Sequence, residues 1–87
     1  MARLNQTLAY LREILANYAD RHHAVAIHLY KKLISKPYKN EEQFVRDLSQ
    51  KEAAFLDRML RQEMKYAKEE QDDVRVHHLN EIYEQLI

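Results

Sequence analysis

The apolar residues near the start of the chain follow a helical period. They are separated by four, three, four and three positions, which places them on one stripe of an α-helix. Asn5 or Thr7 can cap this helix, because either side-chain oxygen accepts a hydrogen bond from the first turn of backbone. The pattern predicts a first helix whose stripe packs into a core or into the groove of a partner. The stripe comprises Leu4, Leu8, Leu11, Leu15 and Tyr18, widened by Ile14.

A second amphipathic segment is expected from about residue 21 to residue 35. Pro37 ends it, because proline lacks a backbone N–H and disfavours helical angles at Lys36. The join to the first helix falls near residues 17–23, where neither Gly nor Pro occurs, so a tight turn and a bend are both open. The face expected to be buried holds Val25, Leu29 and Leu33, with Ala26, Tyr30 and Ile34 beside them.

Two helix start signals follow. Asn40 can cap a short helix, with Gln43 at the reciprocal position of a capping box, and Ser49 and Glu52 form a second such pair. We therefore expect a short helix, a corner at residues 48–49 and a long helix from about residue 50. The short helix would bury Phe44, Val45 and Leu48, and the long one Phe55, Leu56, Met59, Leu60, Met64 and Ala67.

The sequence leaves two alternatives at residues 69–73, a break between two helices or one continuous helix. The acidic residues there favour the start of a new helix with Asp72 as its cap. The absence of Gly and Pro, and an apolar phase that continues through Val74, equally favour one helix of about 35 residues, which would project from a monomer. We predict an all-α fold with a single domain over residues 1–87, a bundle of four to five helices whose last helix is continuous or broken here.

Composition narrows the class of protein. The 87 residues include no Cys and no Gly, which excludes a disulfide scaffold, a Cys-based zinc site and a Gly-rich phosphate loop. No apolar run is long enough to span a membrane, and the N-terminal residues lack the apolar core of a signal peptide. We expect a cytoplasmic protein. Because a chain this short buries a limited share of its surface, the apolar stripes favour a homodimer or a protein partner.

Charge is distributed unevenly along the chain. Residues 1–39 carry seven basic and two acidic side chains, and residues 40–87 carry seven basic and twelve acidic ones. We expect these complementary halves to pack on each other. The alternative is a basic contact surface on the second helix for an acidic partner such as nucleic acid, although the net charge of zero disfavours nucleic acid. That surface would comprise Arg21, Lys31, Lys32, Lys36 and Lys39.

The histidines do not have the spacing of metal ligands. Adjacent histidines, as at positions 22–23 and 77–78, point about 100° apart on a helix. His77 and Glu81 are four residues apart and would need His22 or His23 to complete a site. That combination is the basis of one alternative function, a small metal-responsive regulator. The prediction itself is that no residue binds metal or a cofactor.

Catalysis has little support in the sequence. The candidate hydroxyl groups of Thr7, Ser35 and Ser49 stand in no Gly-flanked nucleophile elbow. Six tyrosines favour a protein-binding surface, since tyrosine is enriched at interfaces. We expect no catalytic residue and no small-molecule substrate, and predict a non-enzymatic interaction or structural protein.

Four segments of the chain form a recognisable set: residues 7–13 (TLAYLRE), 40–48 (NEEQFVRDL), 70–75 (EQDDVR) and 79–87 (LNEIYEQLI). They resemble a small family of spore-forming Bacilli, the sigma-G-dependent sporulation-specific acid-soluble spore proteins. The resemblance implies a protein made late in sporulation in the forespore, with no catalytic or metal motif to carry over. The family name suggests DNA coating, which zero net charge and the lack of a strongly basic segment disfavour. A nucleic-acid-associated spore protein is kept as an alternative.

Overall fold

The computed structural model describes residues 5–87 of the chain. In this range there are helices and no strands, which confirms the predicted all-α class. Leu4 of the predicted first stripe lies outside the described residues. The helices are α1 (Gln6–Asp20), α2 (Ala24–Ser35), α3 (Glu41–Arg46), α4 (Gln50–Glu69) and α5 (Asp73–Leu86).

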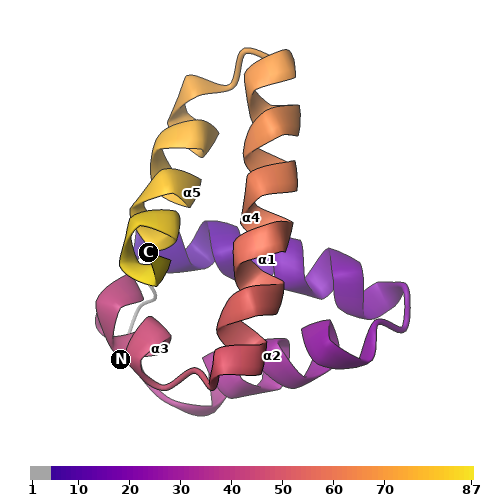
Figure 1. The fold of residues 1–87 in the computed structure, drawn as a ribbon, viewed down its shortest axis with the longest axis vertical. Coiled ribbons are helices and arrows are strands. Elements are labelled where there is room, and N and C mark those ends of the chain that lie inside the picture. Colours follow the sequence, from indigo (N-terminus) through magenta and orange to yellow (C-terminus); the bar gives the residue numbers. More distant parts are fainter. Residues whose placement is uncertain (1–4) are drawn as a thin grey trace.

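The helices form two antiparallel hairpins that cross each other. Figure 1 shows α4 and α5 running side by side, with the hairpin of α1 and α2 lying across them. The short α3 follows α2 and packs against α5. One end of the α4–α5 hairpin, the end that holds its turn, extends past α1 (Figure 1).

The apolar stripes meet in one core within the single chain. Every described helix contributes to it, and Tyr38 from the loop before α3 joins. This closure removes the reason for expecting an obligate dimer, and the dimer itself stays a prediction. Ile34, expected beside the buried face of α2, is instead 52% exposed. The fully buried side chains are Leu8, Leu11, Ile14, Leu15, Ala26, Leu29, Leu33, Phe44, Leu56, Leu60, Leu79 and Ile82.

Side-chain caps start four of the helices. The side chains of Asn5, Asn40, Ser49 and Asp72 each accept a hydrogen bond from a backbone N–H three residues later. The predicted capping box of α4 is complete. The box predicted for α3 is only half made, because Gln43 Oε1 accepts from the backbone N–H of Lys39, 2.9 Å away, and not from that of Asn40.

Both hairpins turn through a residue with positive φ that is not glycine. His22 has φ 61° after α1, and Gln71 has φ 57° after α4. In each case the backbone N–H of this residue and that of the next residue bond back to the last turn of the helix, as in a Schellman motif. The second turn settles the alternative at residues 69–73, because it separates α4 from α5. The first turn makes α2 begin at Ala24, three residues later than expected.

Candidate functional site

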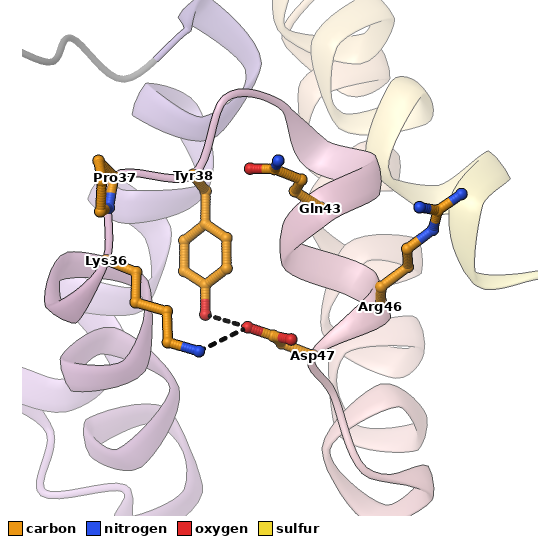
Figure 2. Close-up of a pocket in the computed structure, with 6 residues that line it drawn as sticks. All are labelled: Lys36, Pro37, Tyr38, Gln43, Arg46 and Asp47. Carbon is orange, nitrogen blue, oxygen red and sulfur yellow. Dashed lines mark hydrogen bonds and ion pairs between the residues drawn. The ribbon is translucent and has the colours of Figure 1, made fainter.

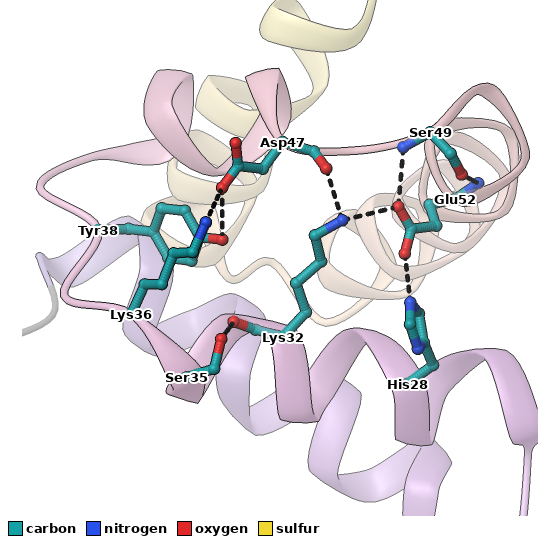
Figure 3. A network of polar contacts seen from close by, with 8 residues as sticks. All are labelled: His28, Lys32, Ser35, Lys36, Tyr38, Asp47, Ser49 and Glu52. Carbon is teal, nitrogen blue, oxygen red and sulfur yellow. Dashed lines mark hydrogen bonds and ion pairs between the residues drawn. The ribbon is translucent and has the colours of Figure 1, made fainter.

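A polar clasp joins α2 to the corner between α3 and α4. We use this name for the set His28, Lys32, Asp47 and Glu52, shown in Figure 3. Lys32 Nζ donates to Glu52 Oε1 at 3.0 Å and also to the backbone oxygen of Asp47. His28 Nε2 lies 2.6 Å from Glu52 Oε2. The clasp adds these polar bonds to the apolar core that α2 and α4 share.

Glu52 is the centre of this clasp. Its carboxylate also accepts a 2.7 Å hydrogen bond from the backbone N–H of Ser49, so one side chain completes the helix cap and receives α2. The side chain is only 10% exposed. Burial by itself would raise the pKa of Glu52, but the hydrogen bonds from Ser49, Lys32 and His28 outweigh burial and lower the pKa from 4.5 to about 2. Glu52 is therefore ionised across the physiological range.

A second ionic contact lies beside the clasp, at the loop between α2 and α3. Tyr38 Oη donates to Asp47 Oδ2 at 2.8 Å, and Lys36 Nζ lies 3.2 Å from the same oxygen (Figure 2). Burial and this hydrogen bond raise the pKa of Tyr38 to about 12, while hydrogen bonds from Tyr38 and Lys36 lower that of Asp47. A pocket of about 400 Å³ opens here, with Arg46 pointing away from the other labelled side chains. The Asp47 carboxylate in this pocket already binds Tyr38 and Lys36, which leaves few groups to hold a charged ligand.

The residues of the predicted basic surface lie along α2 and in the segments at its two ends. Lys32 and Lys36 bind carboxylates of the chain's own second half, as the expectation of complementary halves requires. Arg21 caps the far end of α1, where its guanidinium lies 5.5 Å from the Tyr18 ring centroid. The length of α2, about 18 Å for its 12 residues, separates Arg21 from Lys36. Lys31 and Lys39 are exposed.

A polar groove runs between α1 and the second half of α4. Sequence reasoning missed it, because no periodic pattern marks a place where two helices diverge. The Tyr18 hydroxyl lies in it, and burial and the charge of Glu63 raise the pKa of Tyr18. The two arginines of the groove already have partners in the chain, Arg21 with the Tyr18 ring and Arg75 with Glu63. The groove, of about 480 Å³, is lined by Glu13, Asn17, Tyr18, Arg21, Gln62, Glu63, Tyr66, Ala67, Glu70 and Arg75.

Arg75 in this groove lies close to α4. Its position three and four residues after Asp72 and Gln71 would also allow a side-chain contact with either of them. The guanidinium instead lies 4.0 Å from Glu63, and it is the backbone N–H of Arg75 that binds Asp72 Oδ1. The reason is that Asp72 caps α5, which directs its carboxylate at the helix backbone rather than outward.

The histidines considered as metal ligands are spread over the fold. His77 Nε2 lies 3.3 Å from Glu81, as their spacing predicts. His22 and His23 lie in the turn between α1 and α2, where the His23 ring is 4.8 Å from that of Phe55. Among residues 5–87 no three His, Asp or Glu side chains are grouped as metal ligands would be. The ligand set proposed for a metal-responsive regulator is thus not assembled.

His78 has a packing role between α1 and α5. Its Nδ1 shares a 2.9 Å hydrogen bond with the Thr7 hydroxyl, and its ring stacks on Tyr10 at 5.0 Å between centroids. Thr7 is buried, so its hydroxyl is not presented to a substrate. In the described part of the chain, every buried side-chain nitrogen or oxygen has a hydrogen-bond partner. None of the described helices combines the length and the apolar character needed to cross a membrane.

Comparison with known proteins places the chain in a family. The family model described as CsgA, minor curli fiber component A, matches residues 4–87. A sigma-G-dependent sporulation-specific SASP protein of Bacillus subtilis (strain 168) is 45% identical over 84 residues, which cover 97% of this chain and 100% of the relative. No solved structure matches the chain.

The two descriptions name different settings, a fibre and a sporulating cell. Residues 5–87 form helices joined by turns and loops, with no strand among them. The measured identity with the sporulation protein spans its whole length and bears out the resemblance carried by the four segments of the sequence. The chain therefore belongs to the family that this model defines, and within it is a relative of the sigma-G-dependent sporulation-specific SASP protein.

Proposed function

We propose that this chain is a non-enzymatic helical protein of sporulation, located in the forespore or spore interior and acting through protein–protein contacts. The observation that carries the proposal is the 45% identity over the full length of a relative whose name states sigma-G dependence and sporulation specificity. Relatives at this identity over a whole small domain share a fold.

Two features of the described residues support binding over catalysis. The clasp carboxylates are paired within the chain, and the Thr7 hydroxyl is buried. In contrast, Ile34 is 52% exposed and Tyr66 is 46% exposed. Each of these side chains could anchor a protein partner, since tyrosine in particular is enriched at interfaces.

The developmental part of the proposal is tested by following the protein through sporulation. Immunoblots against the chain are made from the organism that carries its gene, in a normal strain and in a strain that lacks sigma-G. We expect the protein to accumulate late, in the forespore fraction, and only where sigma-G is present. Accumulation in growing cells, or independence of sigma-G, would contradict the proposal.

The contact part is tested by the mass of the native protein. Chain isolated from spores under native conditions is passed through size exclusion with light scattering, beside recombinant chain. We expect a mass above that of the single chain. A complex of two copies alone would support the predicted homodimer, and a monomer from both sources would contradict the proposal.

Nucleic acid is the competing partner. Exposed Lys31, Lys39 and Arg21 are the groups that could contact phosphates. A gel shift with duplex DNA at low salt, repeated with the exposed Lys31 and Lys39 both changed to Glu, separates the two functions. Salt-dependent binding that the double variant loses would favour nucleic acid as the partner. If the chain does not shift the DNA at low salt, this alternative is excluded.

A further inference from the structure

Helix α2 has three sides with different neighbours. Its buried face holds Ala26, Leu29 and Leu33 and points into the core. Successive residues are 100° apart around a helix, so the flanks on either side of this face are set by the sequence. One flank carries His28 and Lys32 and belongs to the polar clasp.

The other side is what we call the outer flank of α2, made of Ile27, Lys31 and Ile34. The two isoleucines are one heptad apart, with Lys31 between them, so all three share a face of the helix. Ile34 is 52% exposed, and Ile27 is half-buried. Lys31 is exposed and forms no ion pair within residues 5–87, unlike the neighbouring Lys32.

The spacing of the flank fits a helix as its partner. Anchors at i and i+7 are the pattern with which one helix packs along another. Tyr30, half-buried at the edge of this flank, widens the apolar strip. A lone ammonium between apolar anchors favours a partner that places a carboxylate opposite it, because such a pair adds specificity to the apolar contact.

A second copy of the chain fits this flank poorly. In a two-fold antiparallel pairing of α2 with itself, each Ile27 would meet the partner copy's Ile34. Lys31, midway between them, would then face its own copy across the axis. Two like charges at the centre of an apolar contact oppose association. A two-fold pairing of this flank with itself is therefore disfavoured, and an acidic helix suits the flank better.

We propose that the outer flank of α2 binds an amphipathic helix of another protein, one that carries a carboxylate between two apolar residues a heptad apart. This inference rests on the proposed function as a contact protein and names the chemistry of the partner. Ile27 and Ile34 supply the apolar anchors, and Lys31 pairs with the carboxylate. The clasp on the opposite flank holds α2 in place while its outer flank is occupied.

A designed helical peptide is the probe. It carries leucines one heptad apart with a glutamate between them, and a matched peptide carries lysine in place of that glutamate. Binding to the full chain is measured by fluorescence anisotropy, and the contacted residues are located by amide chemical shifts. We expect the acidic peptide to bind more tightly than the basic one, and its affinity to fall as the salt concentration rises. Its binding should change the chemical shifts of amides in α2.

Two exposed substitutions test the named residues. Lys31→Glu is expected to lower the affinity for the acidic peptide about tenfold and to raise the affinity for the basic peptide. Ile34→Ala is expected to lower the affinity for both peptides. Lys65→Glu, an exposed lysine of α4, is the matched control and leaves both affinities unchanged. Unchanged affinity in Lys31→Glu and Ile34→Ala overturns the inference, as do shifts confined to the groove at Tyr18 or self-association of the chain that Ile34→Ala abolishes. None of these results alters the sporulation time course that tests the proposed function.

Discussion

Each of the two flanks of α2 carries a lysine, and the two lysines have different surroundings. On the clasp flank, Lys32 reaches a carboxylate at 3.0 Å that is buried at the corner of the chain. On the outer flank, Lys31 is the adjacent residue in the sequence, and it lies exposed between two isoleucines. The difference lies in what the rest of the chain places opposite each flank.

The comparison teaches that a cluster of lysines in a sequence is not one functional unit. A one-residue step turns a side chain by 100° around the helix, so adjacent lysines meet different surroundings. One of them stabilises the fold, while the other is left for a partner.

The largest effect is expected from Glu52→Ala, which removes the acceptor of the clasp flank. The variant loses the reciprocal half of the α4 capping box and leaves Lys32 without its buried partner. We expect the free energy of unfolding to fall by about 2–4 kcal/mol. Urea unfolding measures the loss. Glu69→Ala, at an exposed site in the last turn of α4, serves as control and stays within about 0.5 kcal/mol. A loss in Glu52→Ala no larger than in the control would mean that the clasp does not hold α2.

Acid should weaken the clasp flank and spare the outer flank. The pKa of Glu52 is lowered from 4.5 to about 2 in the folded chain. Its contribution to stability is therefore full above pH 4.5 and is lost as the pH falls toward 2, because the unfolded chain takes up the proton first. Urea midpoints between pH 6 and pH 2 measure this loss. The slope should be shallower in Glu52→Gln, which cannot ionise, and equal slopes in both proteins would contradict the assignment.

A smaller effect is expected from Tyr38→Phe, beside the clasp. The change removes one hydroxyl that donates to Asp47 at 2.8 Å and keeps the buried ring. We expect a loss of about 1 kcal/mol, the net value of a typical hydrogen bond. Tyr66→Phe, whose hydroxyl is at an exposed site, is the control and should change little. An equal change in the two variants would show that the Asp47 contact adds nothing to stability.

Much of this fold was predictable from spacing and caps. The leucine stripe of α1, the stop at Pro37 and the Ser49–Glu52 box each depend on residues close in sequence, and the structure confirms them. The break between α4 and α5 was not predictable in the same way. It passes through Gln71 at φ 57°. A glycine at this position would have predicted such a conformation, whereas a glutamine does not.

The polar contacts were harder to foresee because they join distant residues. Nothing near Lys32 in the sequence indicates that Glu52, 20 residues later, lies opposite it. The five basic residues therefore looked like a single surface, although two of them pair within the chain. Only the packing of α2 against the α3–α4 corner separates Lys32 from Lys31.

The most direct test of this division is a comparison of Lys31→Ala with Lys32→Ala. The two variants make the same change at adjacent positions of one helix, so differences in helix propensity largely cancel. Equilibrium urea unfolding should show a loss of about 1–2 kcal/mol for Lys32→Ala and a change within about 0.5 kcal/mol for Lys31→Ala. Equal changes in the two variants, or a larger loss at Lys31, would contradict the account.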